Sequence, residues 1–185
     1  MIEDIFSTLF AHMRKGVQMH NDLAYAFGFL NLLGYKKCHE YHMLEELHNY
    51  YEAKDFFLYN YSKMLIDENY EPVEIIPANW YKHSREDVDV NTKRSAIKDL
   101  TKIWVEWEKE TKKLLEEKYK ELYEMGEVLC AIKIAEMIKE VSEELKLAQE
   151  KQINLDSIGY DISLIVDEQS DLYDKYKEKI KSIWG

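Results

Sequence analysis

The chain has 185 residues, of which 46% are apolar, so it is long enough to bury one continuous core but short for two. It carries 25 Lys and Arg against 36 Asp and Glu, and the formal net charge of −11 would repel nucleic acids and anionic membrane surfaces. No apolar run approaches the ~18 residues of a membrane span, and Cys38 and Cys130 have neither CxxC nor ligand spacing. We therefore expect one cytoplasmic domain, residues 1–185, that binds neither nucleic acid nor membrane.

Breaks in the helical pattern divide the chain into five predicted helices. Gly34 separates the helices of the first pair, Gly126 separates those of the second pair, and both breaks are short. Between the pairs lies one long connection, Asp67–Asn91, which holds both prolines and lacks helical periodicity. The predicted helices cover residues 2–33, 36–66, 96–124, 127–151 and 157–183.

The lengths of these connections predict the topology. Short breaks make each pair antiparallel, whereas the ~25 residues of the long connection are too many for a tight turn and can run the length of a bundle. The second and third helices should then be parallel. We therefore predict an all-α fold, an antiparallel four-helix bundle over residues 1–151 with one long crossover between its second and third helices. The fifth helix, 157–183, packs on the bundle or covers a subunit contact, because its apolar stripe must be buried.

Two histidines interrupt the apolar stripe predicted for the first helix. His12 and His20 share one face with Leu9 and Leu23 at the spacing of an α-helix. If the chain reverses at Gly34, a residue fourteen positions before the turn lies level with one fourteen positions after it. The sequence therefore predicts that His20 lies level with His48 on the second helix.

The second helix offers a carboxylate and an imidazole near that level. Glu45 precedes His48 by three residues, a spacing that lets one helix donate an oxygen and a nitrogen to one metal centre. His39 and His42 continue the same three-residue spacing, but this spacing drifts by ~60° per step around the helix and does not predict one site. The stripe predicted to be buried on this helix consists of Leu44, Leu47, Tyr51, Leu58, Tyr61 and Leu65.

Each of these residues also has a structural explanation without metal. In a chain with 36 acidic residues, a Glu three residues before a His is expected by chance. His20 is then a core histidine that is hydrogen-bonded to a neighbouring carbonyl or carboxylate, and Glu45 and His48 lie on a solvated helix face.

Three segments resemble the helices of ferritins and of the related miniferritins. HEYHMLEELHNYYEAKDFF resembles the second helix of that family, VEWEKETKKLL the third and EMIKEVSEELK the fourth. The resemblance covers roughly the first 150 residues and implies a ferritin-like bundle. The metal ligands that it implies are Glu45 and His48 on the second helix, Glu108 on the third, Glu144 on the fourth, and His20 or Asp22 in place of the first-helix Glu.

The sequence also departs from that family. No histidine follows His83, so the second ExxH of symmetric di-iron carboxylate proteins is absent. On the predicted helices, Glu108 flanks the buried stripe and Glu144 lies at its edge. A half-site on the first two helices, or no site, is therefore an alternative to a complete centre.

Two classes of function follow. A mixed imidazole and carboxylate site suits iron, with manganese or zinc as alternatives, and oxidation of Fe(II) is its simplest activity. The other class is a helical interaction or scaffold protein that binds no metal and catalyses nothing. Clustered ligands around His20 would favour the first class, and a dry apolar layer the second. The 14 Tyr and 4 Trp predict a homo-oligomer in either case.

Overall fold

The computed structural model describes residues 2–65 and 88–184, and these ranges form helices joined by turns and contain no strand. The all-α class predicted from the sequence is confirmed. Residues 66–87, which include most of the predicted long connection, lie outside the described residues. The helices are α1 (Ile2–Phe29), α2 (Leu33–Tyr61), α3 (Val90–Glu124), α4 (Val128–Ser157) and α5 (Ile162–Trp184).

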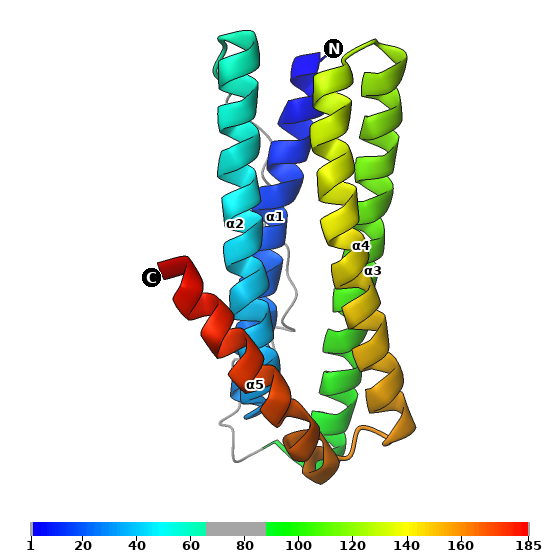
Figure 1. The fold of residues 1–185 in the computed structure, drawn as a ribbon. Helices are drawn as coiled ribbons and strands as arrows, with labels where there is room; N and C mark the ends of the chain where they lie inside the picture. Colours follow the sequence, from blue (N-terminus) through cyan, green and yellow to red (C-terminus); the bar gives the residue numbers. More distant parts are fainter. Residues whose placement is uncertain (1, 66–87, 185) are drawn as a thin grey trace.

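The first four helices form a bundle of two antiparallel pairs (Figure 1). α1 packs along α2, α3 packs along α4, and α2 and α3 run in the same direction. The predicted parallel arrangement of the second and third helices is therefore confirmed. α5 packs mainly on α2 and runs from the end of the bundle back toward its middle. None of the helices in the described ranges is long and apolar enough to cross a membrane.

Local signals in the sequence explain several helix ends. The side chain of Asp89 accepts hydrogen bonds from the backbone N–H groups of Asn91 (2.9 Å) and Thr92 (3.1 Å). This cap begins α3 at Val90, six residues before the predicted start at residue 96, because it satisfies N–H groups that the first turn leaves free. Gly126, with φ 77°, supports the predicted turn between α3 and α4.

The turn between α1 and α2 lies three residues earlier than predicted. The chain reverses around Asn31, which has a positive φ of 62°, and the N–H of Leu32 donates to the carbonyl of Phe27 (2.9 Å). Asparagine tolerates this left-handed conformation better than most residues. Gly34 therefore lies inside α2, and the prediction that it forms the turn is wrong.

Gly34 instead permits a close approach of α5. Its N–H donates to Oε1 of Gln169 on α5 (2.9 Å). A Cβ at position 34 would lie 2.1 Å from the backbone oxygen of Gln169, so any side chain larger than hydrogen would push the two helices apart. The glycine therefore fixes where α5 crosses α2.

The core has two apolar parts with a polar layer between them. One part fills the end of the bundle near the α1–α2 turn and includes Leu23, Phe27 and Trp104. The other fills the opposite end, near the α3–α4 turn, and includes Phe6 and Phe57. Between these parts, the described interior holds the buried polar residues His20, His39, His42, Glu46, Thr101, Glu108 and Thr111.

The buried face of α2 differs from the predicted stripe. Tyr51 is 59% exposed and Leu58 is 40% exposed, although both belong to that stripe. The prediction was wrong for these two residues, whereas Tyr61 and Leu65 of the same stripe do pack against the core. It assumed that the inward face is apolar throughout, but polar residues occupy the middle of the face that α2 buries. The buried residues of α2 are Gly34, Tyr35, Cys38, His39, His42, Glu46, Tyr50, Ala53 and Phe57.

Candidate metal centre

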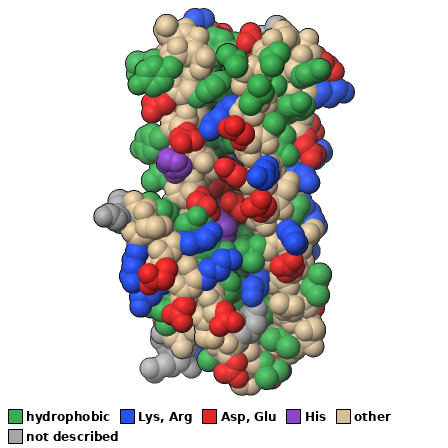
Figure 2. Space-filling view, viewed as in Figure 1, with side chains coloured by type: hydrophobic (Ala, Val, Ile, Leu, Met, Phe, Trp, Pro, Cys, Tyr) green, Lys and Arg blue, Asp and Glu red, His purple; other side chains and the backbone are tan. Residues whose placement is uncertain are grey.

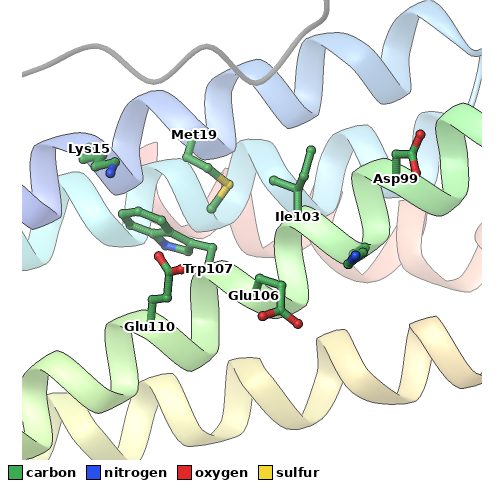
Figure 3. Close-up of a pocket in the computed structure, with 8 residues that line it drawn as sticks. Lys15, Met19, Asp99, Ile103, Glu106, Trp107 and Glu110 are labelled. Atoms are coloured by element: carbon green, nitrogen blue, oxygen red, sulfur yellow. The ribbon is translucent and has the colours of Figure 1, made fainter.

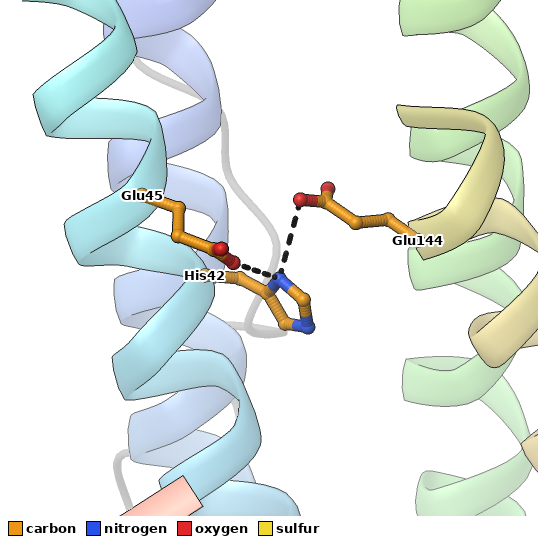
Figure 4. A group of neighbouring side chains, drawn as sticks. All are labelled: His42, Glu45 and Glu144. Carbon is orange, nitrogen blue, oxygen red and sulfur yellow. Dashed lines mark ion pairs between the residues drawn. The ribbon is translucent and has the colours of Figure 1, made fainter. Parts of the chain in front are cut away.

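Three side chains converge between α2 and α4. His42 and Glu45 project from α2, Glu144 projects from α4, and the three point toward one another (Figure 4). Nδ1 of His42 lies 3.1 Å from Oε2 of Glu45 and 3.5 Å from Oε1 of Glu144. One donor atom from each residue lies within 4.8 Å of the others. This is a compact group of one nitrogen and two oxygen donors.

The position of the α1–α2 turn explains why His42 takes part. His20 lies eleven residues before Asn31 and His42 lies eleven residues after it, so the antiparallel pair places them at one level. Their ring centroids are 5.5 Å apart. When the turn moves three residues toward the N-terminus, the residue of α2 that lies level with His20 moves six residues in the same direction. The structure therefore places His42 level with His20, where the sequence predicted His48.

The imidazole of His42 is buried without a hydrogen bond. Its side chain is 4% exposed, and neither Nδ1 nor Nε2 has a hydrogen-bond partner among the described residues. The neighbouring carboxylate oxygens are close enough to interact electrostatically, but their geometry is not that of a hydrogen bond. Nε2 is the nitrogen with no partner of either kind, and a buried polar atom left in this condition costs about 1–3 kcal/mol. Nδ1 faces both carboxylates, and a metal ion shared with them would take the place of its proton.

A second group of polar side chains lies deeper in the bundle. Nδ1 of His20 is 3.0 Å from Nδ1 of His39, and Nε2 of His20 is 3.5 Å from Oε1 of Glu108. The indole N–H of Trp104 donates to the same Glu108 oxygen (3.0 Å), while Oε2 of Glu108 is buried without a partner. Because Glu108 also interacts with Glu144, this group is continuous with the first.

Glu46 adds a further buried carboxyl group. It is 8% exposed and lies opposite Gly16 on α1, where a Cβ would be 2.9 Å from its Oε1 and 3.2 Å from the ring of Trp107. The absence of a side chain at Gly16 therefore makes room for Glu46. Nothing in the sequence pattern singled out Glu46, because it lies outside the predicted stripe of α2.

Burial controls the protonation of the deeper group. It lowers the pKa of His20 to about 3, and burial together with the nearby His20 and His42 holds the pKa of His39 well below its usual range. Burial, with repulsion from Glu144, raises the pKa values of Glu46 and Glu108 well above their usual range. At neutral pH the deeper histidines are therefore uncharged, and the raised pKa values of Glu46 and Glu108 favour the neutral form of these two carboxyl groups.

His42 behaves differently from the deeper histidines. Burial alone would lower its pKa, but interactions with Cys38 and Glu144 outweigh burial and raise the pKa of His42 well above its usual value. Burial would likewise raise the pKa of Glu45, but its interaction with His42 keeps that pKa low. The carboxylates therefore favour a positive charge at His42, which its protonated ring supplies. A divalent metal ion bound to the neutral ring would supply that positive charge instead.

Four of the five predicted ligands lie around this buried region, and one does not. Glu45 and Glu144 belong to the first group, and His20 and Glu108 belong to the second. The side chain of His48 is 70% exposed and pairs with Glu52 at 3.1 Å, so the structure places it away from both groups. The alternative first-helix acid, Asp22, is not among the residues of either group.

A separate cavity of about 370 Å³ lies between α1 and α3 (Figure 3). Met19, Ile103 and Trp107 give it apolar walls, and Lys15 and Glu106 lie among its charged residues. None of the residues that line it belongs to the His42 group. It therefore offers space but no convergent donors for a metal.

Comparison with known proteins identifies the fold. Protein-family models give no match to the chain, and neither do curated proteins. Among solved structures, an engineered closed form of the Archaeoglobus fulgidus ferritin superposes with a TM-score of 0.71, covering 92% of this chain and 93% of that chain. The chain has the ferritin-like fold. At 14% identity this likeness concerns the fold alone, and it confirms the ferritin-like bundle with an additional C-terminal helix that the sequence predicted.

Proposed function

We propose that this ferritin-like chain binds a divalent metal ion at His42, Glu45 and Glu144, and that the ion is Fe(II), which is oxidised there. The observation that carries the proposal is the buried imidazole of His42. Its Nδ1 has no hydrogen-bond partner and faces carboxylates from two different helices. The polar interior at the level of His20 supports this class of function over a scaffold with an apolar interior.

The donor geometry supports a single bound ion. Nitrogen and oxygen ligands lie about 2.0–2.2 Å from a zinc-sized ion, so two ligands of one ion are separated by about 3 Å. The distances of 3.1 Å and 3.5 Å from His42 Nδ1 to the two carboxylates are of this size. Imidazole with carboxylates is a donor set that suits iron, and it also accepts manganese or zinc.

Two buried carboxyl groups, Glu46 and Glu108, lie deeper in the bundle than His42, Glu45 and Glu144. They suit an ion whose positive charge increases when it is oxidised. Fe(II) loses one electron when it becomes Fe(III), and four such ions reduce one dioxygen molecule, with four protons, to two water molecules. Because burial raises the pKa values of Glu46 and Glu108, the neutral form of each carboxyl group is favoured, and loss of its proton would offset part of the extra positive charge of Fe(III). In this proposal Fe(II) is the substrate, and the protein positions it and balances its charge.

Replacement of His42 tests the proposal, with His48 as a matched control on the same helix. Anaerobic calorimetric titration with Fe(II) should show affinity weakened by about 100-fold or more in His42→Ala, while His48→Ala binds as the unmodified protein does. Exposure to air should then produce ferric absorbance at a reduced rate only in His42→Ala. Unmodified protein that binds no Fe(II), Mn(II) or Zn(II) would favour the scaffold class, and equal affinity in His42→Ala would refute the assigned site.

We also propose that the chain forms a homo-oligomer. Several large apolar side chains in the described ranges are exposed, among them Tyr25 (66%), Tyr59 (81%) and Leu129 (66%). Such side chains are commonly buried when subunits associate.

A further inference from the structure

A pocket of about 210 Å³ lies between α2, α4 and α5, directly outside the proposed metal site. His42, Glu45 and Glu144 form part of its wall, and Glu140 and Glu143 extend that wall along α4. Figure 2 shows acidic side chains gathered around a hollow near the middle of this face, with basic side chains below it. The pocket therefore joins the proposed site to the surface.

The acidic wall is suited to attract a cation. Glu140, Glu143 and Glu144 of α4 line this small pocket together with Glu45 of α2, so like charges lie near one another and repel. A cation in the pocket would relieve that repulsion. The nitrogens of His42 are an independent sign of a ligand, because they are buried, lack hydrogen-bond partners and belong to the residue at the inner wall.

Two lysines of α5, Lys175 and Lys179, also line the pocket. Nζ of Lys179 lies 4.4 Å from the ring centroid of Tyr41 and 5.4 Å from that of Tyr176. Nζ of Lys175 lies 5.0 Å from the ring centroid of Tyr176. At these distances the aromatic faces attract the ammonium groups and favour their positions beside the pocket. Lys179 also interacts attractively with Glu45, one of the proposed ligands.

We infer that divalent cations reach the metal site through this pocket, that Glu140 and Glu143 attract them, and that Lys175 and Lys179 oppose their passage. This inference rests on the proposed function, since it names the route to the same site. The two lysines are fixed cations beside the carboxylates that an incoming ion must approach, so they compete with it. Access to the site thus depends on the position of α5.

Contacts with α2 hold α5 where its two lysines lie beside the pocket. Tyr176 is 1% exposed, and its ring centroid lies 5.7 Å from that of His42. Earlier in the same helix, Oε1 of Gln169 accepts the hydrogen bond from the N–H of Gly34. These two contacts hold α5 against α2 on either side of Leu172, which is also buried, and they place the lysines at the pocket.

The rate of Co(II) association, measured by stopped-flow absorbance at low ionic strength, tests the route. The variant Glu140→Gln with Glu143→Gln removes two charges from the pocket. Its control, Glu136→Gln with Glu150→Gln, removes two charges from exposed positions of the same helix that do not line the pocket. Because charged clefts raise association rates by about 10-fold or more, we expect about a 10-fold decrease in the pocket variant and less than about a twofold change in the control.

The lysines should give the opposite result. Lys175→Gln with Lys179→Gln should increase the Co(II) association rate several-fold, whereas Lys146→Gln, an exposed change outside the pocket, should leave it unchanged. If the unmodified protein binds Co(II) and the pocket variants associate at the same rate as their controls, the route is wrong and the proposed function still stands. If the unmodified protein binds no Co(II) and no Fe(II), both are wrong.

Discussion

The variant Gly34→Ala tests whether the close approach of α5 to α2 requires glycine. A Cβ at this position would lie 2.1 Å from the backbone oxygen of Gln169 and 2.9 Å from its Cβ. Both distances are shorter than van der Waals contact, and rotating a side chain cannot move a backbone oxygen. α5 must therefore shift, and the 2.9 Å hydrogen bond from the Gly34 N–H to Gln169 is weakened or lost.

The expected magnitude follows from opposing contributions. Alanine in place of glycine within a helix stabilises by about 0.5–1 kcal/mol, whereas overpacking costs about 1–3 kcal/mol and loss of the hydrogen bond about 1 kcal/mol more. A shift of α5 also begins to expose Ile165 (0% exposed) and Leu172 (4%). We expect the free energy of unfolding to fall by about 2–3 kcal/mol.

Urea unfolding followed by far-UV circular dichroism measures this change, and Gly28→Ala provides the matched control. Gly28 also lies in a helix, but the three atoms nearest to its added Cβ would all belong to the Lys36 side chain, with Cδ nearest at 3.0 Å, and that flexible chain can move away. We expect Gly28→Ala to be neutral or up to about 1 kcal/mol more stable. A Gly34→Ala variant as stable as Gly28→Ala would refute the argument that α5 needs glycine at this crossing.

Two further predictions concern association and pH. If the chain forms a homo-oligomer, light scattering at micromolar concentration should give at least twice the mass of one chain, and a strictly monomeric mass would contradict this. Burial lowers the pKa of His12 from 6.5 to about 4, so the unfolded chain gains a proton between these values that the folded chain does not. The contribution of neutral His12 to the free energy of unfolding is therefore fully present above pH 6.5. It is lost as the pH falls from 6.5 to about 4, and the loss is at most about 3 kcal/mol. In His12→Gln, which can keep the hydrogen bond to Thr111, stability should fall less over this range, and an unchanged decline would exclude His12 as its source.

Helix number and topology could be predicted because their signals are local. Repeated apolar spacing defined each helix, and the contrast between short and long connections defined which helices run parallel. Even so, the start of α3 was placed six residues late, because the predicted boundary followed apolar periodicity and missed the Asp89 cap. Capping is also a local signal, so this error concerned which sequence feature was used.

The candidate site was predicted less completely because it depends on register between helices. A turn placed at Gly34, where the structure turns at Asn31, directed attention to His48 and away from His42. The assumption that a buried face is apolar then hid Glu46 as well. Glu45, Glu108 and Glu144 were identified, the last two through the resemblance to ferritins, but how far each is buried could not be read from one helix at a time.

The sequence by itself determined an acidic, all-α chain of five helices with two antiparallel pairs. It also placed His20 on the buried face of the first helix. These properties follow from composition, spacing and connection length, which act over a few residues. Only the tertiary structure decided that His42 meets Glu144, that Gly34 admits α5, and that Lys175 and Lys179 face the acidic pocket. Each of these contacts joins residues on different helices, and small shifts in a turn or rotations of a helix about its axis change all of them while leaving the helical pattern intact.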